Sequence, residues 1–167
     1  MEKVLIVASA LICFLLGLVG TGSADTFTVE GKVYCDTCRT QFITRITEFM
    51  PDAVVRLECK DREGGSITFS ADAISDRHGV YHIPVQGDHE DEICEVFLVK
   101  SPRPDCNGIP KPEKNKEDSA RVSITKNNGM ISGVRRVSPM GFLITKAKPE
   151  CAEVLRELGI TPQGLVP

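Results

Sequence analysis

Two cysteines separated by two residues are the part of this sequence best suited to chemistry. They stand in the run Cys35-Asp36-Thr37-Cys38-Arg39. Pairs with this spacing occur in dithiol redox enzymes, in zinc sites and in disulfide frameworks. The redox interpretation requires the first cysteine at a helix N-terminus in a βαβ setting. Here the pair ends an alternating strand pattern, which disfavours redox catalysis.

A zinc site is disfavoured by the lack of further ligands at a suitable spacing. Structural zinc is held by four ligands, which come as two pairs of Cys or His. The sequence has no second Cys-x-x-Cys, and His78, His82 and His89 do not combine with a nearby Cys into a second pair. We therefore expect no metal and no cofactor, and we interpret Cys35 and Cys38 as structural.

The N-terminus has the organisation of a secretory signal. A short charged start, Met1-Glu2-Lys3, precedes an apolar run over residues 4–19 and small residues at 20–24. The apolar run is too short to span a bilayer comfortably, so an uncleaved membrane anchor is the less favoured alternative. We predict that residues 1–24 form a cleaved signal peptide and that residues 25–167 form one domain.

Export changes how the cysteines are interpreted. Of the seven cysteines, Cys13 lies within the signal, and the six that remain are Cys35, Cys38, Cys59, Cys94, Cys106 and Cys151. An even number in an exported chain predicts three disulfides, because the extracellular space is oxidising. Each disulfide typically stabilises a fold by about 2–4 kcal/mol. Six cysteines allow fifteen pairings, and the spacing alone does not choose among them.

Charge and hydropathy exclude two classes of partner. The formal net charge is −3, whereas nucleic-acid-binding proteins usually present a concentrated basic face. No second long apolar run follows the signal, so we expect no membrane association after cleavage. No Asn-x-Ser/Thr sequon occurs, so N-glycosylation is not expected.

The mature chain has the pattern of short strands separated by turns. In the first strand, one face carries Phe27, Val29, Gly31, Val33 and Cys35, and the other carries Thr28, Glu30, Lys32 and Tyr34. This period of two is typical of a half-buried strand, with the second face expected in solvent. Further strands are predicted at residues 53–60, 67–71, 80–85, 93–100, 120–126, 130–137 and 141–144.

The connections predict hairpin turns, one long loop and one helix. Gly64 and Gly65 mark a hairpin turn at residues 62–66, and an Asn-Asn-Gly turn occupies residues 127–129. Residues 101–119 carry four prolines and should form a surface loop. A short C-terminal helix is predicted to begin at Pro149 and to end at Gly159. The fold class is therefore mainly β, a single-domain antiparallel sandwich or barrel of about seven strands.

Ten residues at the end of the first strand resemble a family signature. The run from 30 to 39, with Glu30, Gly31, Val33, Tyr34, Cys35, Asp36, Cys38 and Arg39 as its most characteristic members, resembles that of the pollen Ole e I (olive-pollen major allergen) family. Stretches at residues 51–59, 79–81, 87–94 and 138–142 agree with it. The similarity spans nearly the whole mature chain, including all six cysteine positions.

The resemblance implies a secreted plant protein with a mainly antiparallel, barrel-like β fold. It also implies the disulfides Cys35–Cys106, Cys38–Cys151 and Cys59–Cys94, which would tie the proline-rich loop and the C-terminal helix to the first strand. Members of the family are linked to pollen-tube growth or cell-wall development, several are allergens, and none has a well-established catalytic activity. The missing sequon and the tail after Cys151 depart from many relatives.

Neither of two chemical clusters points to an enzyme. Ser75, Asp76 and His78 include the residue types of a catalytic triad, but a triad is assembled in space, and their adjacency in a turn is no argument for one. Residues 88–92 form an acidic cluster that could hold Ca²⁺, but it lacks the spacing of a calcium loop. We interpret both clusters as solvated turns.

The predicted function is that of a non-enzymatic protein secreted to the apoplast or cell wall. It would act as a ligand or matrix component in pollen-tube or wall growth, with an extracellular protein or a cell-wall polysaccharide as its partner. The alternative is a secreted protease inhibitor that uses residues 101–106. In that loop Arg103 is followed by Pro104, which would make it a poor site for trypsin-like proteases.

Overall fold

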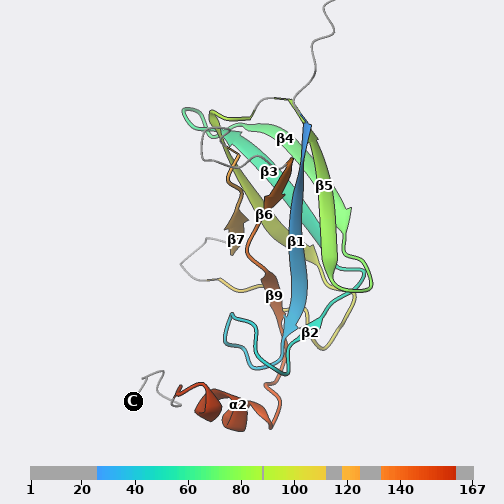
Figure 1. Ribbon diagram of the computed structural model, residues 1–167, viewed down its shortest axis with the longest axis vertical. Coiled ribbons are helices and arrows are strands. Elements are labelled where there is room, and N and C mark those ends of the chain that lie inside the picture. Colours follow the sequence, from blue (N-terminus) through green and yellow to red (C-terminus); the bar gives the residue numbers. More distant parts are fainter. Residues whose placement is uncertain (1–25, 88, 112–117, 125–132, 161–167) are drawn as a thin grey trace, which may run out of the picture.

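Two β-sheets packed face to face form the body of the molecule, and a short helix lies at one end (Figure 1). The computed structural model describes residues 26–87, 89–111, 118–124 and 133–160. The predicted mainly β fold, with three disulfides and a short C-terminal helix, is confirmed. The predicted signal at 1–24 and the turn at 127–129 lie outside the described residues.

The first sheet is built around one long strand, β1 (Thr26–Asp36). Its antiparallel partners are β2 (Glu48–Phe49) and β5 (Val80–Gln86), and its parallel partners are β8 (Val134–Arg136) and β9 (Met140–Leu143). The parallel pairing and the two-residue β2 were not predicted. Residues far apart in the sequence thus meet along β1. The strand therefore positions the segments that come together at its C-terminal end.

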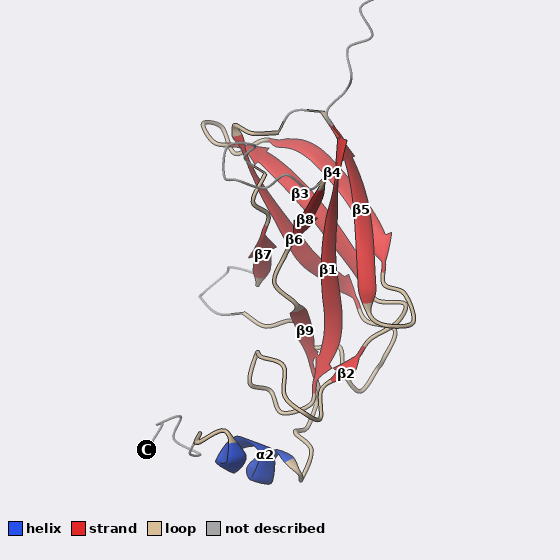
Figure 2. Cartoon of the chain, in the orientation of Figure 1, coloured by secondary structure: helices blue, strands red, loops and turns tan. Residues whose placement is uncertain are grey.

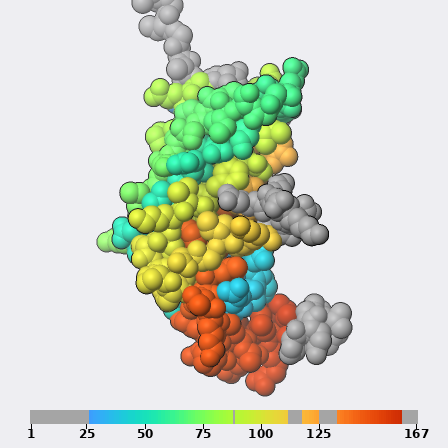
Figure 3. All heavy atoms as spheres, turned by 180° about the vertical axis from the view of Figure 1, so that it is seen from behind, coloured from blue at the N-terminus to red at the C-terminus, as the bar shows by residue number. Residues whose placement is uncertain are grey.

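The second sheet is antiparallel, in the order β4-β3-β6-β7. Its strands are β3 (Val54–Asp61), β4 (Ile67–Ile74), β6 (Glu92–Lys100) and β7 (Ser119–Arg121). The predicted hairpin turn at residues 62–66 joins β3 to β4, and β4 runs three residues further than expected. The strands predicted at 120–126 and 130–137 are shorter within the described residues, as β7 and β8. Figure 3 shows this side of the molecule, with β4 and β3 in green and teal.

The core lies between the sheets and follows the alternation of the strands. Every second residue of β3, namely Val55, Leu57 and Cys59, is fully buried. The first sheet contributes Val29, Val33, Tyr81, Ile83 and Val85, and β6 contributes Cys94, Val96 and Leu98. Burying an aliphatic side chain of this size contributes about 1.5–3 kcal/mol to folding, so this shared core holds the two sheets together.

Tyr34 is buried, although the alternation of β1 predicts it on the solvent face. It is 2% exposed because β9 pairs with β1 at this point and brings Gly141 directly opposite its ring. A Cβ at Gly141 would stand 2.5 Å from the Tyr34 ring, so only glycine leaves room for the side chain. Burial, followed by the charges of Asp36 and Asp118, raises the pKa of Tyr34 to about 12.

The C-terminal helix α2 (Cys151–Glu157) is separated from the sheets and lies at the end of the molecule (Figure 2). It begins two residues later than predicted from Pro149, with Glu150 as the residue before its first turn. Gly159 follows the helix with a φ of 71°, as a helix-ending glycine should. No helix in the described part of the chain is long and apolar enough to cross a membrane.

Candidate functional site

Two disulfides gather three distant segments at the C-terminal end of β1. We call this region the braced end and define it as residues 35–50, 101–108 and 143–158. Cys35 is bonded to Cys106 and Cys38 to Cys151, with Cα–Cα distances of 6.0 and 5.4 Å. These are the pairs that the family resemblance implies. In Figure 3 the segment after β1 (cyan) lies against the C-terminal segment (orange to red) at the lower end.

The carboxylate of Asp36 organises the turn that contains the cysteine pair. One of its oxygens accepts a hydrogen bond from the Cys38 N–H at 3.2 Å, and the other accepts from the Gln41 N–H at 2.6 Å. The Asp36 residue is 1% exposed, and hydrogen bonds to a carboxylate are stronger than those to neutral acceptors. The guanidinium of Arg39 in turn donates to the carbonyl of Ile144, the residue directly after β9.

Backbone conformations that are unfavourable for side-chain-bearing residues occur twice in this turn. Arg39 and Gln41 both have a φ of 61°, in the left-handed region that costs roughly 1–2 kcal/mol per residue. Such residues persist only where the surroundings fix them, and they concentrate at functional sites. Here the Asp36 carboxylate and the disulfide at Cys38 fix the turn, so its shape is imposed rather than locally preferred.

A group of paired charges connects the three segments of the braced end. The Glu48 carboxylate accepts hydrogen bonds from Lys148 and, with a smaller effect, from Arg103, and both hold the pKa of Glu48 below its usual value. Arg103 also donates to the Asp105 carboxylate at 3.1 and 2.6 Å and lowers the pKa of that group. Arg103, which we considered as an inhibitor's contact residue, is therefore turned toward its own carboxylates.

Helix α2 is attached to the rest of the braced end by a few contacts besides its disulfide. Its Glu157 carboxylate pairs with the Arg45 guanidinium at 2.8 and 3.1 Å. The Lys148 N–H just before the helix donates to the Thr37 carbonyl at 3.0 Å. The Thr37 hydroxyl donates to the Ile46 carbonyl at 3.1 Å, so the same residue also fixes the loop.

Large apolar side chains lie at the surface of this constrained loop. Phe42 and Ile43 are 38% and 43% exposed. They directly follow the turn fixed by Asp36 and precede the Thr44 N–H, which is bonded to the Thr47 hydroxyl. An apolar pair on a loop of fixed shape can bind a partner without the entropic cost of ordering the loop first.

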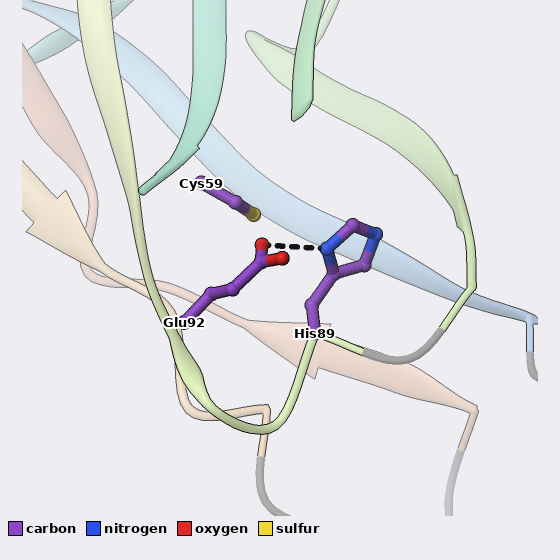
Figure 4. Close-up of side chains that lie close together, drawn as sticks. All are labelled: Cys59, His89 and Glu92. Atoms are coloured by element: carbon purple, nitrogen blue, oxygen red, sulfur yellow. Dashed lines mark hydrogen bonds and ion pairs between the residues drawn. The ribbon is translucent and has the colours of Figure 1, made fainter. Parts of the chain in front are cut away.

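A second cluster of potential ligands lies at the other end of the second sheet, where Cys59, His89 and Glu92 approach one another (Figure 4). Each of its groups already has a partner. The Cys59 sulfur is bonded to Cys94, and the His89 ring bonds to Glu92 at 2.7 Å through Nδ1 and to the Gln86 carbonyl at 3.1 Å through Nε2. A disulfide sulfur is not a thiolate, so we assign this cluster to closing the turn between β5 and β6.

The family signature of residues 30–39 divides between the sheet and the braced end. Glu30, Gly31, Val33 and Tyr34 belong to the sheet: Gly31 faces the Tyr81 ring, whose hydroxyl would lie 2.2 Å from a Cβ at that position. Glu30 pairs with Arg136 and His82. The rest of the signature, from Cys35 to Arg39, forms the start of the braced end. Phe42, Ile43, Glu48 and Lys148 were not identified from the sequence, because no motif or periodicity marks them.

The fold and the braced end together define a class of protein: a β-sandwich whose terminal loops are held in one shape by disulfides and buried polar contacts. Within that class, this chain belongs to the family of Ole e 1-like pollen proteins. The family model described as "Pollen protein Ole e 1 like" matches residues 25–159.

Individual relatives agree with this assignment. An Olee1-like protein of Betula pendula is 49% identical over 99% of both chains. The pollen allergen Sal k 5.0101 of Kali turgidum is 48% identical over 83% of this chain and 91% of its own length. The crystal structure of the major plantain pollen allergen Pla l 1 superposes with a TM-score of 0.68 at 40% identity, covering 75% of this chain and 99% of the allergen.

Proposed function

We propose that this protein is secreted after removal of residues 1–24 and acts without catalysis in the apoplast or cell wall. Its partner would be an extracellular protein or a cell-wall polysaccharide, in pollen-tube or wall growth. The observation that carries this proposal is the exposed pair Phe42–Ile43 on a loop fixed by the Cys38–Cys151 disulfide and the Asp36 carboxylate. Three disulfides suit an oxidising compartment, and the named relatives are pollen proteins.

The residues that resembled a catalytic triad serve to shape a turn. The Ser75 hydroxyl donates to the Met50 carbonyl at 2.7 Å and accepts from the Ala53 N–H at 3.0 Å. The Asp76 carboxylate accepts from the N–H groups of His78 and Val80. A nucleophile needs a base within hydrogen-bond reach. The Ser75 hydroxyl is instead committed to backbone groups, which supports a non-enzymatic role.

The inhibitor alternative gains no support from the braced end. An inhibitory loop must present a side chain to the protease, whereas Arg103 pairs with Glu48 and Asp105. Its backbone N–H is bonded to the Ser101 hydroxyl at 3.1 Å. The loop is rigid, but its rigidity serves the internal structure of the braced end.

The test is a comparison of partners retained by three forms of the oxidised protein. Wild type, Phe42→Ser/Ile43→Ser and Val99→Ser are immobilised and exposed to pollen cell-wall and membrane extracts. Val99 is 40% exposed on a sheet strand and provides the matched control. We expect a set of bound proteins or glycans that wild type and the control share and the double variant loses at least about tenfold. Equal retention by all three forms contradicts the proposal.

A further inference from the structure

The outer edge of β4 is an open strand edge. Among the described residues β4 pairs with β3 alone, so its other side carries backbone groups without a strand partner. The Ser75 N–H donates to the Ala53 carbonyl at 2.9 Å, which sets the alternation along the strand. The backbone groups of Ala71 and Ala73 therefore face β3, and those of Ser70 and Asp72 face outward.

The edge of the other sheet is closed to pairing by a proline. The Val33 N–H donates to the Gly79 carbonyl at 2.8 Å, so the alternation along β5 turns the backbone of Pro84 away from β1. Proline has no N–H to offer at that position, and proteins commonly protect edge strands in this way. The sequence of β4, ITFSADAI, contains neither proline nor lysine.

The side chains of β4 also leave the edge accessible. Ser70 and Asp72 are exposed, and Ile74 is 66% exposed. The one charge on the strand, Asp72, is held by the Arg56 guanidinium through two bonds of 2.7 and 3.0 Å, within its own sheet. This pairing holds the Asp72 carboxylate over its own sheet and weakens, without cancelling, the repulsion that a charge exerts on an approaching strand.

We propose that β4 pairs antiparallel with β4 of a second copy of this chain, around a two-fold axis at Ala71. In this register Ser70 lies opposite Asp72 of the second copy, and Phe69 lies opposite Ala73. Hydrogen-bond complementarity favours it: a hydroxyl that can donate faces each carboxylate, whereas an axis at Asp72 would place two carboxylates opposite each other. The register also avoids the irregularity between Cys59 and Lys60, which affects the start of β4. A two-fold axis makes the interface self-complementary.

The size of the contact sets the expected strength. One pair of short strands joins the two four-stranded sheets into one continuous sheet, but it buries an area at the low end for specific interfaces. The main-chain hydrogen bonds supply the affinity, as in other cases of strand addition. We therefore expect a dimer with a dissociation constant on the order of 100 µM. Such a dimer forms where the protein is locally concentrated.

Two opposite substitutions at Ser70 test both the edge and the register. Ser70→Asp places a carboxylate opposite Asp72 of the second copy at both symmetric positions, and Ser70→Lys places an ammonium there. Dimerisation is measured by sedimentation equilibrium at about 1 µM to 1 mM protein, a range that includes the expected dissociation constant. We expect Ser70→Asp to weaken it at least about tenfold, with partial recovery in high salt, and Ser70→Lys to strengthen it in low salt. Equal effects of the two variants overturn the proposed register.

A proline substitution on each edge provides the matched comparison. Ser70→Pro removes an outward N–H from β4, and His82→Pro does the same on β5, where Pro84 already interrupts the edge. We expect only Ser70→Pro to abolish the dimer, with far-UV circular dichroism verifying that both variants fold. Amide exchange of wild type adds a measurement that needs no variant, because the Ser70 and Asp72 amides should slow as concentration rises. A wild-type protein that remains monomeric at 1 mM overturns the proposal.

Discussion

The disulfide within the sheet and the two disulfides of the braced end perform different tasks. Cys59 and Cys94 are direct neighbours in the β3–β6 pairing, so their bond reinforces a contact that the strands already make. Cys106 belongs to a loop that meets β9 at one isolated bridge, between Gly108 and Leu143, and Cys151 belongs to the helix α2. The Cys59–Cys94 bond strengthens the β-sandwich, which unfolds as one unit. The two bonds of the braced end determine where a loop and a helix with few other attachments lie.

The largest expected effect on the free energy of unfolding comes from removing the disulfide within the sheet. Both sulfurs are buried in the core, and the bond closes a separation of 35 residues. Cys59→Ala/Cys94→Ala should lower the free energy of unfolding by about 2–4 kcal/mol, because the unfolded chain gains freedom and the core loses packing. Urea unfolding measures the change. Amide exchange in α2 below the unfolding transition should stay as in wild type, and its acceleration would contradict the separation of tasks.

Removing the bond to the helix should have a large local effect and a smaller global one. An isolated seven-residue helix is unstable in water, and besides its disulfide α2 has one buried apolar side chain, Val154, and the exposed Arg45–Glu157 pair. Cys38→Ser/Cys151→Ser should therefore speed amide exchange in α2 by about 100-fold while the β3 and β6 amides remain protected. Equal acceleration in the helix and the strands would show that the braced end is part of the cooperative core.

The two tyrosines report on two parts of the first sheet. Tyr34 lies directly before the braced end with a pKa of about 12, and burial in the core raises the pKa of Tyr81 further. Absorbance at alkaline pH should show no tyrosinate near pH 10, where both ionise in the unfolded chain. Because the folded pKa values lie above the unfolded ones, stability should fall as pH rises above 10. Tyr34→Phe should remove the first step; ionisation of either tyrosine near pH 10 in the folded protein would disprove its burial.

The smallest effect concerns the paired charges of the braced end. Glu48→Gln should cost about 0.5–1 kcal/mol at pH 7, a modest value because the carboxylate is 40% exposed and screened by solvent. The pKa of Glu48 in the folded state is below its usual 4.5, so its contribution exists above that pH and disappears as pH falls through the folded pKa. Unfolding curves of wild type and variant should differ at pH 7 and coincide near pH 2. If the two proteins differ in stability by the same amount at both pH values, the effect of Glu48→Gln comes from packing and not from the charge.

The sheets could be predicted from the sequence and most of the braced end could not, for a physical reason. A strand shows its buried face by alternation, so the faces of β1 and β3 followed from Val29, Val33, Val55 and Leu57. Tyr34 was misplaced because its burial depends on Gly141, a contact between residues far apart in the chain. The positive φ values of Arg39 and Gln41 likewise depend on hydrogen bonds that no local pattern encodes.

The most direct test of the account is a disulfide map of the protein isolated from its native source. The braced end exists only if Cys35 and Cys38, which are separated by two residues, are bonded to different partners. Proteolysis with partial reduction and mass spectrometry should give one fragment with Cys59 joined to Cys94 and another in which Cys35 joins Cys106 and Cys38 joins Cys151. A bond between Cys35 and Cys38, or a free thiol at either, would contradict the account.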